Sequence, residues 1–154
     1  MKRLQLSESD RERLQSGPVT VRRAMRPEPG HECIEIVDTH DGDFEMQHYY
    51  SGGRVQRGHL GFIKPPFTPG EVVYVPEGWA VLRDEIPSPG ITTLVYYRTA
   101  YEPPVWATEP KWRTAASMPS WAARLHARCV SVDAVKGERW EWVATFERCE
   151  PQGE

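Results

Sequence analysis

Several features that mark common protein classes are missing from this chain of 154 residues. It has only three cysteines, Cys33, Cys129 and Cys149, and none of them forms a CxxC motif, so a secreted disulfide framework is not indicated. No signal-like apolar stretch follows Met1, and no run approaches the ~18 apolar residues of a membrane span. We therefore expect a soluble protein of a reducing cytoplasm.

A strong excess of one charge is also lacking. The chain has 19 basic and 22 acidic residues, a net charge of −3 and a pI of about 6.0, whereas domains that coat nucleic acid usually exceed pI ~9. The charge is unevenly placed, because residues 1–30 and 91–130 each carry +3 and residues 31–90 carry −6. If the fold brings the two positive segments together, they form a basic groove suited to a phosphate-bearing ligand rather than to long DNA. The alternative is a set of charges scattered over a solvated surface.

The usual signatures of metal, cofactor and nucleophile sites are absent as well. The five histidines show neither HxH nor HExxH spacing, and His40, Asp41 and Asp43 fit a solvated turn better than a site for a hard cation. There is no GxSxG motif and no cysteine in a recognisable nucleophile context. The glycines of residues 52–61 match neither a P-loop nor GxGxxG, which favours a flexible hairpin. We expect no metal and no cofactor.

What the chain does have is proline, tryptophan and short alternating segments. Its 14 prolines are about twice the usual ~5% share, and its six tryptophans suggest loops around an aromatic core. A capping box at Ser7 and Asp10 predicts a helix over 8–15, and 118–124 is expected to form a single helical turn capped by Ser117. Strands are predicted at 18–25, 31–38, 44–50, 71–75, 91–98, 125–134 and 140–147. The fold class is therefore α+β and mostly β, with a small β-barrel, one or two short helices and long loops.

The most distinctive segment runs from Lys111-Trp112-Arg113 to Met118-Pro119-Ser120-Trp121-Ala122-Ala123-Arg124. It resembles the KWRxxxxMPxWAxR segment of phage and prophage proteins of the ASCH family, which share the PUA-like β-barrel fold. Residues 17–23, 69–79 and 140–148 also resemble family segments, so the resemblance covers about two thirds of the chain. It implies one ASCH domain over 1–154 with a variable hairpin insertion around 31–62.

The chain departs from the enzymes of this fold at positions that carry their chemistry. Relatives that act as amidohydrolases on acetylated cytidine use a lysine and a threonine in the first motif, where this chain has Val19 and Arg22. A tight turn at 135–138 stands where those relatives have a polar helix that carries a glutamate. Valine cannot act as a nucleophile or a general base, so the resemblance implies binding without this catalysis.

PUA-like barrels accept a nucleotide or base in a cleft beside the barrel, where rings stack and arginines meet phosphate. Carried onto this chain, the cleft would hold the candidate ligand-binding residues Thr20, Arg22, Arg23, Glu77, Trp79, Lys111, Trp112, Arg113 and Arg124. Arg22 and Arg23 are then expected close to residues 111–113.

Each candidate also has a structural alternative. Trp121, Trp140 and Trp142 are expected in the core, with Trp142 and Phe146 on its closing strand, whereas Trp79 and Trp112 fit core and cleft equally well. Arg113 and Arg124 fit an ion pair, for instance with Glu77, as well as they fit a ligand contact. Glu77 could instead accept hydrogen bonds from the amino group of a base.

Three functions remain open at this point. The first is a non-catalytic protein that binds a nucleotide or a short RNA or DNA. The second is an enzyme that processes nucleic acid or modified nucleosides, an amidohydrolase or nuclease using Glu77 with Lys111 or an arginine. The third is a protein-interaction role in phage assembly or interference with host defence, with the acidic middle segment as contact surface and Tyr49-Tyr50 as its aromatic anchor.

Overall fold

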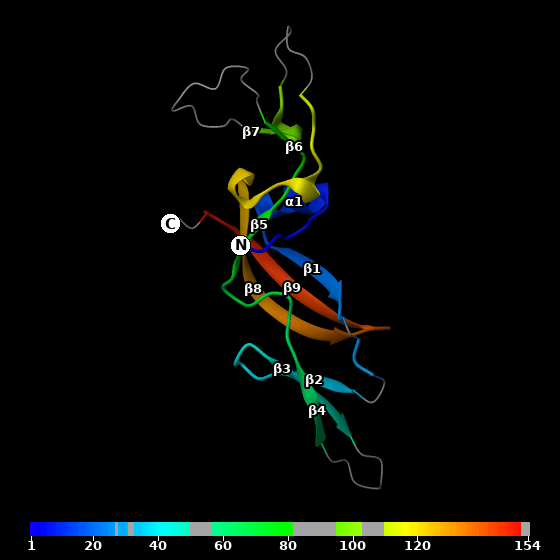
Figure 1. The fold of residues 1–154 in the computed structure, drawn as a ribbon. Helices are drawn as coiled ribbons and strands as arrows, with labels where there is room; N and C mark the ends of the chain where they lie inside the picture. The colour runs from blue at the N-terminus through cyan, green and yellow to red at the C-terminus, as the bar shows by residue number, and fades with distance from the viewer. Residues whose placement is uncertain (27, 31–32, 50–56, 82–94, 103–109, 152–154) are drawn as a thin grey trace. The chain divides into compact units, whose positions relative to one another are not determined.

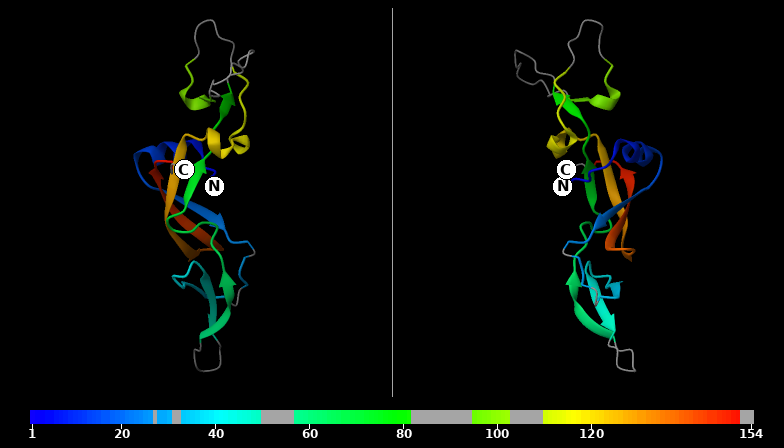
Figure 2. Two further views of the ribbon diagram at one scale, coloured as in Figure 1. Left: turned by 60° about the vertical axis from the view of Figure 1, so that its left-hand side comes forward. Right: turned by 90° about the vertical axis from the view of Figure 1, so that its right-hand side faces the viewer.

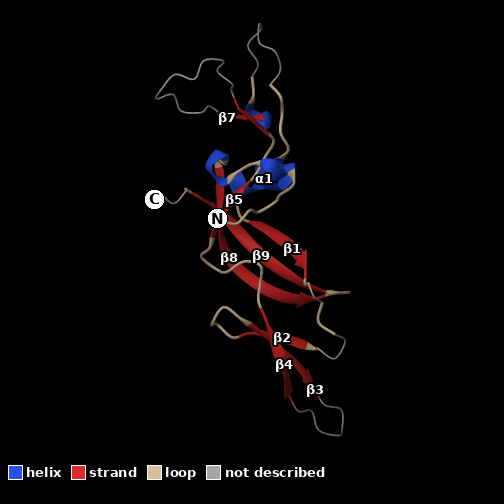
Figure 3. Cartoon of the chain, viewed as in Figure 1, coloured by secondary structure: helices blue, strands red, loops and turns tan. Residues whose placement is uncertain are grey.

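The computed structural model describes all residues except 27, 31–32, 50–56, 82–94, 103–109 and 152–154 (Figure 1). The described chain is mostly β, with one short α-helix and several antiparallel strand pairs (Figure 3). The elements are α1 (Glu8–Ser16), β1 (Val19–Ala24), β2 (Glu35–Asp38), β3 (Phe44–Tyr49), β4 (Arg57–Ile63), β5 (Val72–Val75), β6 (Trp79–Val81), β7 (Val95–Tyr97), β8 (Leu125–Lys136) and β9 (Trp140–Cys149), with three 3₁₀ turns at Arg98–Ala100, Ala115–Ser117 and Ser120–Ala122.

The strands form three sheets. Their orders are β1-β9-β8-β5, β2-β3-β4 and β6-β7, and none of them closes into a barrel within the described residues (Figures 1 and 2). The described chain divides into two compact units. The first comprises residues 1–11, 72–127 and 149–154, and the second comprises residues 12–71 and 128–148. The expected class, mostly β with a short helix, is confirmed.

In the second unit, β1 and β9 pair in the register that their alternating sequences favour. Val19 lies opposite Phe146 and Arg23 opposite Trp142. Trp142 and Phe146 are buried as predicted, and each ring meets a phenylalanine edge to face, Trp142 with Phe44 at 4.9 Å and Phe146 with Phe67 at 5.0 Å. These contacts make the apolar face of β9 the core of this unit.

The strands predicted at 31–38 and 44–50 are present in the described part of those ranges as β2 and β3, which pair as a hairpin across residues 39–43. Its turn holds His40 in the left-handed region with φ 65°, and Asp38 Oδ1 accepts a hydrogen bond from the His40 backbone N–H at 2.8 Å. β4 overlaps the range 52–61, where the sequence predicts a flexible hairpin, and it pairs with β3 through a register shift at Met46/Gln47. Gly61 lies opposite this shift with φ 138°, a conformation that favours glycine.

In the first unit, β5 is the buried strand that its β-branched sequence predicted. Val73 and Val75 are fully buried, and the N-terminal segment adds to this strand because Leu4 N donates to Tyr74 O at 2.9 Å. The sequence predicts no strand directly after residue 75, but Trp79 begins β6, which pairs with β7. The predicted strand 91–98 is observed as β7, and residues 91–94 lie outside the described part of the chain.

Two details of the 117–124 segment differ from the prediction. The 3₁₀ turn Ser120–Ala122 begins after Pro119, without a side-chain cap, because Ser117 Oγ instead donates to Thr114 O and accepts from Trp79 Nε1. Trp140 and Trp142 are buried, but the expectation of a buried Trp121 is wrong, since its side chain is 65% exposed. The turn buries Ala122 together with Met118 instead, so the bulky neighbour points outward.

No helix within the described ranges is long and apolar enough to cross a membrane.

Candidate functional site

The β6–β7 pair of the first unit places two aromatic rings side by side. Trp79 and Tyr97 are directly opposite each other in the antiparallel register, so their side chains share one face. An arginine lies over each ring: the guanidinium carbon of Arg113 is 4.9 Å from the Trp79 ring, and that of Arg124 is 4.5 Å from the Tyr97 ring. Both distances suit cation–π contact. The pair therefore presents two guanidinium groups on a rigid aromatic base.

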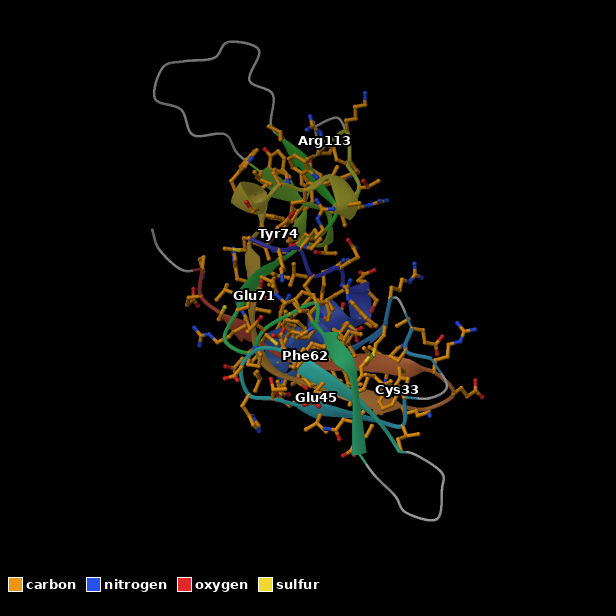
Figure 4. The ribbon with its side chains drawn as sticks, turned by 60° about the horizontal axis from the view of Figure 1, so that its bottom comes forward. Cys33, Glu45, Phe62, Glu71, Tyr74 and Arg113 are labelled. Atoms are coloured by element: carbon orange, nitrogen blue, oxygen red, sulfur yellow. The ribbon has the colours of Figure 1, made fainter. Side chains whose placement is uncertain are left out.

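Trp79 is fixed from three directions. The Trp79 backbone N–H donates to Arg113 O at 3.3 Å, and the Arg113 backbone N–H donates to Trp79 O at 2.7 Å. The indole Nε1 of Trp79 donates to Ser117 Oγ at 3.1 Å. The side chain is only 3% exposed and packs in a core with Met118 and Ala122. The core alternative thus holds for Trp79, and its ring supports Arg113. Arg113 is labelled in Figure 4.

Glu77 makes a buried, two-pronged pair with Arg124. Arg124 Nε donates to Glu77 Oε2 at 2.9 Å and Nη2 donates to Oε1 at 2.8 Å, while Thr99 Oγ1 also donates to Oε1. Glu77 is 1% exposed, whereas the Arg124 side chain is 34% exposed. The ion-pair alternative is therefore realised by Arg124, and both carboxylate oxygens already accept hydrogen bonds within the protein.

The electrostatics follow from this pairing. The hydrogen bond with Glu77 raises the pKa of Arg124, against the opposing effect of burial. Burial first, and the Glu77 charge second, raise the pKa of Tyr97 above its usual value of 10.0. The Tyr97 hydroxyl therefore stays protonated at neutral pH and donates to Ala122 O at 2.7 Å, which holds the 3₁₀ turn against β7.

Two further cations, Arg98 and Lys111, belong to the segments that carry Tyr97 and Arg113, and like Arg113 they have no carboxylate partner in the part of the chain that the structure describes. Arg98, Lys111 and Arg113 are all exposed. Arg98 packs on the backbone of Gly78, where a Cβ would lie 3.3 Å from the Arg98 Cβ, so glycine permits this close approach. The exposed charges that the structure describes at and beside β6 and β7 therefore include three positive side chains, in a protein that is negative overall.

The remaining aromatic candidate, Trp112, joins a second group of rings. Its ring centre is 5.3 Å from that of Tyr101, which in turn lies 5.3 Å from Tyr96, and both contacts are edge to face. Trp112 is half-buried, so it stabilises the segment that carries Lys111 and Arg113.

The candidates from the first strand belong to the second unit. Arg22 and Arg23 project from opposite faces of β1, since successive side chains of a strand alternate. Arg22 is exposed and lies opposite Val143. On the same face, the hydroxyl oxygens of Thr20 and Thr145 are 3.4 Å apart. On the other face, the guanidinium carbon of Arg23 is 5.3 Å from the centre of the Phe67 ring. A groove on one face of β1 can therefore include Arg22 or Arg23, but not both. Their closeness to residues 111–113, which belong to the first unit, stays a prediction.

Sequence reasoning missed Tyr97, Arg98, Thr99 and Trp121 at this site. Tyr97 and Arg98 lie outside the segments that resemble the ASCH family. Thr99 contributes a single hydrogen bond to Glu77, which no sequence motif indicates. The exposure of Trp121 was indicated only by its small neighbour Ala122, because a short turn that buries one side chain leaves the adjacent side chains exposed.

Other chemistries have less support. No group of three His, Cys, Asp or Glu side chains within the described ranges is arranged for a metal ion. Burial raises the pKa of the Cys129 thiol to about 11, so it is not an activated nucleophile. A cavity of about 270 Å³ in the second unit is lined by Phe44, Val132 and four loop residues, together with Asp38 and His40, whose Oδ2 and Nδ1 atoms are 3.8 Å apart. Asp38 Oδ1 already accepts the His40 backbone N–H within the same turn, so this cavity has less support as a binding site than the arginines at β6–β7.

No family model, curated protein or solved structure matches the chain. The resemblance to the ASCH family accordingly stays a prediction.

Proposed function

We propose that this chain is a non-catalytic protein that binds a nucleotide or a short RNA or DNA, with the PUA-like fold of the ASCH family and a phage or prophage origin. The observation that carries the proposal is the exposed guanidinium of Arg113, which lies over the Trp79 ring. Arg98 and Lys111 are also exposed, and neither has a carboxylate partner among the residues that the structure describes. Guanidinium and ammonium groups in this setting bind phosphate, and a rigid aromatic support reduces the entropy lost on binding.

The enzyme alternative depends on Glu77, and the hydrogen bonds of that residue argue against it. A general base must reach the proton that it removes. The Glu77 side chain is buried, and Arg124 and Thr99 donate hydrogen bonds to its oxygens. Glu77 would have to leave this buried ion pair before it could accept a proton from a substrate. Glu77 suits the positioning of Arg124 better than it suits contact with a substrate.

The binding test is a titration of mononucleotides and labelled oligonucleotides of about ten nucleotides at two salt concentrations, about 50 and about 200 mM. Three exposed cations at the site predict a slope of log K against log salt of about −2 to −3. Arg113→Ala should lower the affinity and make the slope shallower by about one phosphate contact. Arg139→Ala, which removes an exposed arginine from the second unit, is the matched control and should change neither value.

The results separate this proposal from its rivals. Binding weaker than millimolar for every ligand in the panel would refute it and favour the protein-interaction role, as would equal losses from Arg113→Ala and Arg139→Ala.

A separate assay addresses catalysis. With Val19 where amidohydrolase relatives have lysine, we expect no release of acetate from acetylated cytidine. Turnover that depends on Glu77 would support the enzyme alternative.

A further inference from the structure

Trp121 is a large aromatic side chain held in an exposed position by a well-anchored turn. Its side chain is 65% exposed, whereas tryptophan is on average heavily buried. The residues around it in the turn are fixed: Met118 and Ala122 are buried, and Ala122 O accepts the Tyr97 hydroxyl at 2.7 Å. The exposure of Trp121 therefore comes from the fold of the turn.

The orientation of the ring leaves a face available. Trp121 meets Trp79 at 6.3 Å with an angle of 88° between the ring planes. Such a T-shaped contact uses the edge of one ring and the face of the other, so it occupies at most one face of Trp121. The contact also restrains the indole, which lowers the entropy cost of stacking a flat ligand on its other face.

Two guanidinium groups are tied to the same support. Arg113 lies over Trp79, the ring that Trp121 touches, and Arg124 follows Trp121 by three residues and lies over Tyr97. Arg124 uses Nε and Nη2 for Glu77, and its Nη1 donates to no acceptor among the residues that the structure describes. The exposed ring is thus accompanied by N–H donors suited to phosphate.

We propose that Trp121 is a stacking platform for an unpaired base, so that the site takes single-stranded nucleic acid, with Arg113 and Arg124 contacting the phosphates. This inference rests on the proposed function. In a duplex, both faces of an internal base are stacked on its neighbours, and a protruding indole reaches a base face only where the strand is single or the base is displaced. Stacking on an aromatic side chain tolerates any base, so no sequence preference is expected from Trp121.

The test compares the full chain with Trp121→Ala and Trp121→Phe, using oligothymidylate and oligouridylate of about ten nucleotides and a blunt DNA duplex of the same length. Trp121→Ala should weaken single-strand binding about 5- to 150-fold without changing the salt slope. Trp121→Phe should recover most of the affinity, because phenylalanine keeps a ring. The control Phe62→Ala removes another exposed aromatic side chain, in the second unit, and should have no effect.

Each outcome has one meaning. Tight single-strand binding that Trp121→Ala leaves unchanged overturns the platform while the proposed function stands, and so does duplex binding as tight as single-strand binding. If no oligonucleotide or mononucleotide binds at all, the proposed function fails and the platform with it. An unchanged melting temperature of Trp121→Ala shows that a loss of affinity does not come from unfolding.

Discussion

The two partners of the Glu77–Arg124 pair are unequally exposed, and this decides what each substitution costs. Arg124→Ala leaves a carboxylate that is 1% exposed without its main partner, which should destabilise the fold by about 3–5 kcal/mol. Glu77→Gln keeps an acceptor and leaves a guanidinium that still reaches water, so its cost should be about 1–3 kcal/mol. Urea unfolding followed by tryptophan fluorescence measures both values. Equal costs would mean that Glu77 gains solvent when Arg124 is removed.

His126 gives a second prediction at this scale. It is buried, its Nδ1 has no hydrogen-bond partner among the described residues, and burial lowers its pKa, with a smaller opposing effect of Glu150. Because the unfolded chain binds the proton more readily, the contribution of neutral His126 is complete above pH ~6.5 and is lost as the pH falls below that value.

Urea midpoints at several pH values, compared with those of His126→Asn, measure this contribution. The wild-type chain should lose more stability than the variant between about pH 7 and about pH 5. Parallel curves for the two chains would contradict the assignment.

At the scale of elements, β9 carries the buried face of the second unit. Trp142 packs edge to face on Phe44, so Trp142→Ala should cost about 3–5 kcal/mol of unfolding free energy. Trp121→Ala removes the same side chain from an exposed turn and should cost far less. Thermal unfolding of the two variants side by side tests the contrast, and similar losses would contradict the difference in burial.

The same scale shows why some elements could be predicted. The helix at 8–15 and the strands at 18–25, 125–134 and 140–147 follow from local patterns, a capping serine and a period of two. In the structure, Ser7 Oγ accepts the Asp10 backbone N–H at 3.2 Å as the capping box predicts. β6 could not be found this way, because its three residues are specified by their pairing with β7 and by Arg113.

At the scale of the whole molecule, the balance of charge limits the kind of binding that is expected. A chain of net charge −3 should not bind long duplex DNA by charge alone. We expect retention of plasmid DNA in a mobility-shift assay to disappear at about 200 mM salt, while binding of a short single strand persists more weakly. Salt-resistant retention of plasmid would contradict the local character of the site.

The sequence by itself determined the mostly-β class, the helix and its cap, the hairpin at 39–43 and the buried face of β9, because propensity, turn chemistry and alternation act between near neighbours. The sequence also indicated that the most distinctive motif lies in residues 111–124. Only the tertiary structure decided that Glu77 pairs with Arg124, a partner 47 positions away, that Arg113 lies over Trp79, and that Trp121 is exposed while Ala122 is buried. These outcomes depend on which distant groups share a buried space, and a single linear pattern of polar and apolar residues does not specify that.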